Sequence, residues 1–305
     1  MMLGIRLAAG KANEAPPPDL AQLPQHERLR RGRIEHPQAL IVQAQYGDWS
    51  DRIDFGAAAY AVRCQLDHGD YRTGVYSFCM CPGGYIVPAS TDPERLVVNG
   101  MSLSKRGSPY ANSGLVVTID EKMVAQWAQQ NGHNDPSDDP LVGIAFQDAI
   151  EHAAYGLGGG DYVAPAQRIT DLVNNRRSTD LPGCSYKRGI ISANLNQVFP
   201  ESVYQALQSA LPQFEQQVAG YFTQEAILVA AESRSSSPVQ IERDRQRCES
   251  ISHPGLFPCG EGAGQAGGIA SAALDGIRSA EALLQVLSQV CRARSNLQRV
   301  FELQS

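Results

Sequence analysis

The residues best suited to chemistry in this sequence are glycines near its carboxyl end. Seven of the 28 glycines lie between positions 255 and 276, and Gly262, Gly264 and Gly267 match the pattern G-x-G-x-x-G. Glycine lets the backbone approach a ligand where a Cβ atom would collide. A helix start presents unpaired N–H groups and the positive end of the helix dipole. The cluster predicts either a site for a phosphate or an electron-rich ring, or a tight strand-to-helix turn with close packing.

The elements around the glycines argue against a complete dinucleotide-binding unit. We expect a short apolar strand at 256–259 and then a helix from about 268 to 290, with one apolar stripe made of Leu274, Ile277, Ala280, Leu283, Leu284 and Leu287. A dinucleotide fingerprint needs a further parallel strand after the helix, with an acid about 20 residues on. The pattern predicts no such strand, and no G-K-[ST] follows the glycines. We therefore expect the turn to form one wall of a cofactor site.

Two cysteines, Cys79 and Cys81, stand two residues apart just before a Gly-Gly pair. In a strand both side chains would project to one face. They supply only half of a tetrahedral zinc site, and a disulfide at this spacing would be strained, so no metal site is predicted. They are either small buried residues beside a turn or thiols that exchange electrons with a nearby cofactor.

Three other groups could act on a substrate. His36, beside a glutamate, is either half of an acid–base pair or a structural histidine. Arg234 and Ser235 begin a donor-rich stretch that either holds a carboxylate or phosphate or forms an ordinary Ser/Pro turn. Gln167 and Arg168 follow a glycine stretch and are weaker substrate candidates. The patterns G-x-S-x-G and H-E-x-x-H do not occur, so common hydrolase and zinc-protease readings lack support.

Composition places the chain among ordinary globular proteins. Hydrophobic residues make up 43%, charged residues 19%, and the net charge is −6. Nucleic-acid phosphates need a basic surface, so no nucleic-acid partner is expected. The seven cysteines show no framework spacing, and no run of about 18 apolar residues occurs. We expect a cytoplasmic protein without a disulfide scaffold or membrane span, acting on a small molecule.

Apolar spacing predicts a strand-rich first part and a helical middle. We expect strands at 74–78, 85–87, 96–98, 115–119 and 226–231, and helices at 144–153, 166–173, 201–211 and 213–221. Pro212 should end one helix or start the next. The resulting division is a poorly ordered segment at 1–32, a strand-rich part at 33–115, an α+β unit at 116–225 and a closing segment at 226–305.

Several runs, taken together, resemble a known family. They are RIEHPQ at 33–38, VYSFCMCPGG at 75–84, VNGMS at 98–102, APAQR at 164–168, ESRSSSP at 232–238 and GLFPCGEGAG at 255–264. They resemble the carboxyl-terminal portion of the bacterial FAD-dependent dehydrogenase-like flavoproteins, over about residues 33–284. The resemblance implies a mixed α/β fold, in which a partial three-layer FAD/NAD(P)-binding domain carries an inserted α+β substrate domain. It also implies an oxidoreductase that uses FAD, with NAD(P)H as an electron donor.

The resemblance assigns eight cofactor contacts: Gly260, Glu261, Gly262, Ala263, Gly264, Gly267, Gly268 and Ile269. Gly260 and Glu261 stand where relatives have a glycine–acid pair whose carboxylate reaches the ribityl chain of FAD. The last three would place helix-start N–H groups against the pyrimidine edge of the flavin. Relatives carry an amino-terminal βαβ unit for the ADP half, and this sequence shows no counterpart of it. We therefore expect either the carboxyl-terminal part of such an oxidoreductase or a non-catalytic truncated paralogue that binds a partner or nothing.

Overall fold

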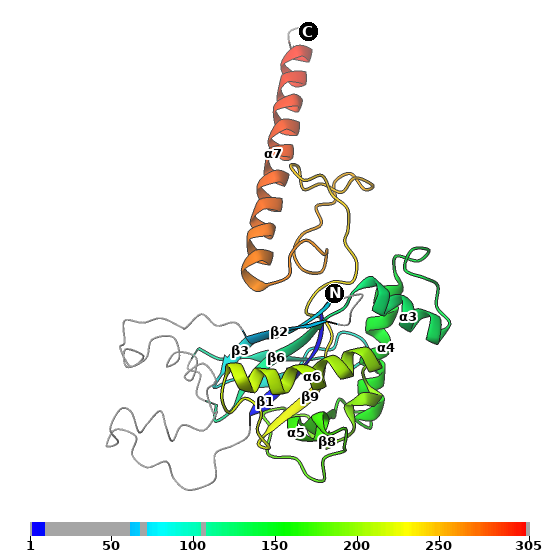
Figure 1. Ribbon diagram of the computed structural model, residues 1–305. Coiled ribbons are helices and arrows are strands. Elements are labelled where there is room, and N and C mark those ends of the chain that lie inside the picture. Colours follow the sequence, from blue (N-terminus) through cyan, green and yellow to red (C-terminus); the bar gives the residue numbers. More distant parts are fainter. Residues whose placement is uncertain (1, 10–61, 68–71, 105–107, 303–305) are drawn as a thin grey trace, which may run out of the picture.

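A seven-stranded sheet organises most of the molecule (Figure 1). The computed structural model describes residues 2–9, 62–67, 72–104 and 108–302. The strand order is β2-β3-β6-β1-β9-β7-β8. The strands are β1 (Met2–Ala9), β2 (Val62–Asp67), β3 (Arg72–Pro82), β6 (Ala111–Thr118), β7 (Ala164–Arg168), β8 (Ile190–Ser192) and β9 (Ala226–Glu232). Neighbours are antiparallel except β7 and β8, which pair in parallel.

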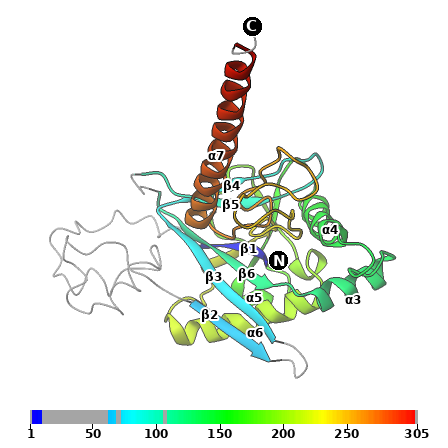
Figure 2. The same ribbon diagram turned by 90° about the horizontal axis from the view of Figure 1, so that it is seen from above.

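Both faces of the sheet are covered. β9 is buried along its whole length and β6 along all but its last residue, which requires packing on both sides. Helix α6 (Glu201–Gln217) packs on β2, β3 and β6, and the short α5 (Ile169–Val173) packs on β7 and β9. A two-stranded sheet of β4 (Tyr85–Pro88) and β5 (Val98–Met101) contacts the large sheet, mainly through β5. Figure 2 shows the large sheet between α6 and this small sheet.

Two further helices pack on each other. They are α3 (Glu121–Asn131) and α4 (Val142–Leu157), and α4 contacts β7 and β9. Asp120 caps α3, because its Oδ1 accepts a hydrogen bond from the Met123 N–H at 2.8 Å. Trp127 of α3 meets Phe146 of α4 edge to face, with 5.2 Å between ring centroids. A single 3-10 turn at Leu195–Gln197 precedes α6.

The predicted elements agree with this structure in most places. The strands at 74–78, 85–87, 115–119 and 226–231 and the helix at 144–153 are confirmed within a few residues, while the strand expected at 96–98 begins two residues later, as β5. Of the helix expected at 166–173, residues 169–173 are confirmed as α5, whereas residues 166–168 belong to strand β7. The break at Pro212 was wrong, because α6 runs through it. An internal proline costs about 3 kcal/mol, and the buried face that includes Leu207, Leu211 and Phe214 offsets that cost.

The predicted division of the chain differs from the structure in its first segment and at its second boundary. Residues 2–9 were assigned to a poorly ordered segment, yet they form β1, which pairs with β6 on one side and β9 on the other. The boundary at 115/116 falls inside β6. One sheet therefore joins β1 to strands from all three of the predicted parts that lie between residues 33 and 305, and among the described strands only β4 and β5 pair apart from it. The remaining part continues through residues 233–268 into α7 (Ile269–Glu302), which projects away from the sheet in both views (Figures 1 and 2).

Candidate functional site

The glycine-rich segment is a chain of turns, and the strand predicted at 256–259 is absent from it. Pro254 and Pro258 cannot donate to a strand ladder, which explains the difference. Gly255, Gly260 and Gly264 all have positive φ, at 87°, 74° and 70°. A strand needs negative φ, so three of the positions that make this segment glycine-rich also prevent it from extending.

Hydrogen bonds close a tight loop around Glu261. The Gly264 N–H donates to the Glu261 carbonyl at 2.9 Å, and the Gln265 N–H donates to the Gly260 carbonyl at 3.0 Å. Gly264 has a second reason to be glycine, because a Cβ atom there would lie 2.4 Å from the Val239 carbonyl oxygen. The loop is thereby pressed against residues 239–241 and fixed in shape.

A buried ion pair joins this loop to α7. Arg243 and Asp275 have side chains only 8% and 10% exposed, and Nη2 of Arg243 lies 2.5 Å from Oδ1 of Asp275. Arg243 Nη1 also donates to the Pro258 carbonyl at 2.7 Å. The Gly260 N–H donates to Oδ2 of Asp275 at 2.9 Å. Asp275 thus fixes the backbone of the glycine that precedes Glu261. Local sequence patterns did not indicate this pair, although an acid inside a largely apolar helix was a usable signal for Asp275.

Glu261 is the acidic side chain of this loop that is available to bind a ligand. It is half-buried, and among the described residues its carboxylate has no hydrogen bond or ion pair. Burial raises the pKa of Glu261 above the usual range of a glutamate. Cβ atoms placed at Gly260, Gly262 and Gly267 would meet no atom within 4 Å, so the loop has open space at these three positions. Ala263, in contrast, is buried and packs inward.

The glycines end at the first turn of α7. The Gly268 carbonyl accepts bonds from the Ala272 N–H at 2.8 Å and the Ser271 hydroxyl at 2.9 Å, which starts the helix. Ile269 follows and is 87% exposed. The first N–H groups of a helix have no partner within the helix. The backbone N–H groups of Gly267, Gly268 and Ile269 are therefore placed to donate hydrogen bonds to an anion or to an electron-rich ring edge.

The two cysteines of β3 occupy a bulge. The pairing of β3 with β6 shifts between Phe78 and Cys81, and Cys79 has a φ of 48°. The expected common face is therefore lost, since the two-residue alternation is broken. Cys79 is exposed and Cys81 is half-buried, so the buried alternative does not hold for Cys79. The Cys81 thiol donates to the Cys79 carbonyl at 3.4 Å.

Arg234 is committed to the protein itself. Its Nη2 and Nε lie 2.7 and 2.9 Å from the two carboxylate oxygens of Glu151, which is almost fully buried on α4. The Ser233 hydroxyl donates to the same carboxylate at 2.6 Å, and Arg234 Nη1 donates to Thr91. The Ser235 hydroxyl is buried and has no partner in the part of the chain that the structure describes. The predicted anion-holding role of Arg234 is thus filled by Glu151.

Gln167 and Arg168 are likewise occupied within the fold. The Gln167 side chain is fully buried; its Nε2 donates to the Arg176 carbonyl at 2.7 Å, and its Oε1 accepts from the Leu195 N–H at 3.0 Å. Arg168 Nη2 pairs with Asp180 at 2.9 Å. Both side chains hold neighbouring loops onto β7. We therefore give them a structural role and leave them out of the candidate site.

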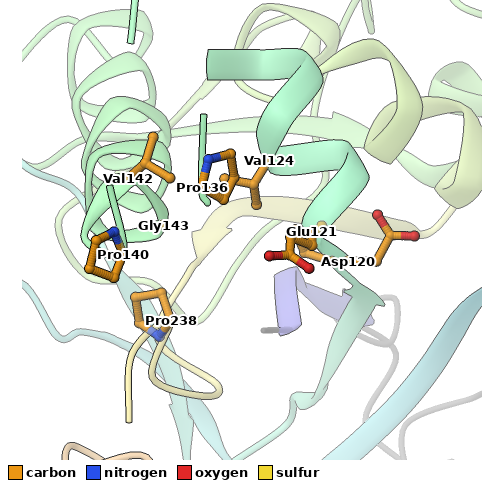
Figure 3. Close-up of a pocket in the computed structure, with 9 residues that line it drawn as sticks. Asp120, Glu121, Val124, Pro136, Pro140, Val142, Gly143 and Pro238 are labelled. Carbon is orange, nitrogen blue, oxygen red and sulfur yellow. The ribbon is translucent and has the colours of Figure 1, made fainter. Parts of the chain in front are cut away.

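A separate hollow of about 350 Å³ lies at the starts of α3 and α4 (Figure 3). It is lined by Ile119, Asp120, Glu121, Val124, Pro136, Pro140, Val142, Gly143 and Pro238. Pro238 lies close to α4, because a Cβ atom on Gly143 would lie 3.0 Å from the Pro238 Cβ. Asp120 is used as the cap of α3, which leaves Glu121 as the acid that this lining offers. The walls are otherwise proline and aliphatic, unsuited to acid–base work.

His36, the remaining sequence candidate, lies outside the described residues. Within the ranges that the structure covers, no cluster of three or more His, Cys, Asp or Glu side chains is placed to hold a metal ion. The helices in these ranges also include none that is long and apolar enough to cross a membrane.

A family model described as "FAD-dependent protein, C-terminal domain-like" matches residues 32–235, more than half of the chain. The chain belongs to this family. The match includes β2 to β9 and ends at Ser235, so the glycine-rich segment lies beyond it. An uncharacterised protein of Clostridium beijerinckii is 42% identical over 255 residues, which make up 83% of this chain and 45% of that protein. The chain thus matches less than half of the length of this relative.

Proposed function

We propose that this chain supplies the flavin-facing part of an FAD site in an FAD-dependent oxidoreductase. One observation carries the proposal: the half-buried Glu261 carboxylate has no partner among the described residues and stands beside open glycine backbone at the start of α7. Membership of the FAD-dependent C-terminal-like family supports it.

The residues of the loop fit the ribityl and flavin parts of FAD. Ribityl hydroxyls are hydrogen-bond donors, and a carboxylate that accepts them makes a charge-assisted bond. The open space at Gly260 and Gly262 leaves room for the sugar-like chain to lie against the backbone. Contacts to the adenine half would come from a unit that completes a three-layer FAD-binding arrangement.

Each group in the loop has a distinct task in this proposal. When bound, FAD accepts and returns an electron pair. Glu261 binds a ribityl hydroxyl and orients the cofactor. Helix-start N–H groups at Gly267, Gly268 and Ile269 stabilise negative charge on the flavin edge. Asp275 acts through Gly260 as a positioning residue. A small-molecule substrate and NAD(P)H as electron donor complete the proposal.

Glu261→Gln should weaken flavin binding by about 10- to 100-fold, which corresponds to the roughly 1.5–3 kcal/mol of a hydrogen bond to a charged group. The same change should not lower the stability of the free protein. The pKa of Glu261 is raised by burial, so its charged form costs stability above that pKa, and the cost disappears as the pH falls through it. Titration of the full chain with FAD, followed by flavin fluorescence, measures the first effect, and urea denaturation measures the second.

Glu242→Gln is the matched control, since Glu242 is exposed in the same segment. It should leave flavin binding unchanged. Equal flavin binding by the Glu261→Gln and Glu242→Gln proteins would rule out the ribityl contact.

A further inference from the structure

Helix α7 carries a broad apolar face that lies open to solvent. Ile277, Leu284 and Leu287 are 58%, 62% and 49% exposed, and Val290 is exposed beside them. Ile277, Leu284 and Leu287 belong to the stripe that sequence periodicity would turn toward a core, and Val290 lies three residues, just under one helical turn, beyond Leu287. In the part of the chain that the structure describes, no element packs on this stripe. We call Ile277, Ala280, Leu283, Leu284, Leu287 and Val290 the α7 face.

The orientation of the α7 face is fixed by the other side of the helix. Asp275, Ser279 and Ala282 are turned toward the protein, and Ser279 and Ala282 are buried. Arg243 holds both Asp275 and Ser279, with Nη1 3.1 Å from the Ser279 hydroxyl. The helix therefore cannot rotate its apolar side inward without breaking a buried ion pair.

The width of the α7 face indicates what kind of surface would cover it. At about 100° per residue, the face spans roughly 140° of the helix circumference from Val290 to Ile277. A two-stranded coiled coil needs only a narrow a/d seam, so a single partner helix would leave much of this face exposed to solvent. A sheet or a pair of helices in a globular unit would cover it. Contiguous apolar patches that are exposed to solvent are typical of sites where another protein surface docks.

We propose that the α7 face docks a globular unit equivalent to the part of the Clostridium beijerinckii protein that lies beyond the matched region. That part is more than half of the relative, so it is long enough to form a domain. The α7 face starts at Ile277, two residues after Asp275, which accepts a hydrogen bond from the Gly260 N–H, so a unit docked there would lie near Glu261. The inference rests on the proposed function in one respect, since the docked unit would carry the remaining FAD contacts.

The test uses the full chain and the unmatched part of the Clostridium beijerinckii protein, produced as a separate polypeptide. Mixed without FAD, the two should form a 1:1 complex in size-exclusion chromatography with light scattering. Leu284→Asp with Leu287→Asp should weaken that complex at least 100-fold, because each buried carboxylate would lack a partner. Gln285→Asp with Gln289→Asp adds the same charge on exposed positions away from the α7 face and should leave binding unchanged. Circular dichroism checks that both variants keep the helix.

The outcomes separate this inference from the proposed function. Absence of a complex, a dimer of the chain in its place, or a complex that tolerates both aspartates would overturn the docking site. A complex that depends on the α7 face but holds no FAD would contradict the proposed function and leave the docking site standing. A complex that binds FAD and is not weakened by Leu284→Asp with Leu287→Asp would contradict the docking site alone.

Discussion

Arg234→Met should lower the free energy of unfolding by about 3–5 kcal/mol, the usual cost of leaving a buried charge without its partner. The charge left behind is Glu151, whose side chain is only 2% exposed and which receives two of its bonds from Arg234. The Ser233 hydroxyl would remain as its other side-chain donor. Urea denaturation of the full chain, monitored by circular dichroism, measures the change.

Arg95→Met provides the control for that prediction. Arg95 pairs with Asp148 on the same helix as Glu151, but Asp148 is half-exposed, so water can replace the lost partner. The expected cost is below about 1 kcal/mol. If the two substitutions lower the free energy of unfolding equally, the interaction of Arg234 with Glu151 does not hold the loop after β9 onto α4.

Asp275→Ala should release α7 from the glycine-rich segment. It leaves Arg243 buried without its carboxylate, at a cost of about 3–5 kcal/mol, and it removes the acceptor of the Gly260 N–H. We expect faster hydrogen exchange over residues 256–290 with little change in the sheet, together with weaker flavin binding. The Arg243 guanidinium holds the pKa of Asp275 below its usual range. The stability from this pair is therefore present above about pH 4, the ordinary aspartate pKa, and is lost as the pH falls through the lowered value.

Arg247→Met is the control for Asp275→Ala. It tests whether losing any ion pair near the glycine-rich segment speeds hydrogen exchange, or only losing the buried one. Arg247 pairs with Glu249 at 2.8 Å, but its side chain is 64% exposed. Its loss should leave hydrogen exchange in α7 unchanged. Unchanged exchange after Asp275→Ala would show that the Arg243–Asp275 pair does not anchor the helix.

Local sequence patterns predicted the elements better than their assembly. The β-branched run of β6 and the periodicity of α4 gave the right elements because propensity and burial act along a few residues. The place of β1 between β6 and β9 depends on pairing across more than a hundred residues, which no local pattern records. Pro212 misled because the buried face of α6 outweighs the local cost of proline.

Only the locally encoded part of the candidate site could be predicted from the sequence. Glycines with positive φ, such as Gly264, have a clear signature, and the loop they form was found by composition. The partners Arg243 for Asp275 and Glu151 for Arg234 come from distant positions and could not be paired from the sequence. Arg234 therefore looked like a free anion-binding group until its carboxylate was placed.

A titration of the full chain with riboflavin, followed by flavin fluorescence, measures whether the Glu261 loop binds the flavin half of FAD. Riboflavin carries the flavin ring and ribityl chain but no ADP, so it probes the part of FAD that the Glu261 loop is proposed to hold. We predict saturable binding that FAD displaces and ADP does not, and that Glu261→Gln weakens. An absence of saturable binding to riboflavin and FAD, or displacement by ADP, would contradict the proposal that this loop holds the flavin and ribityl parts of FAD.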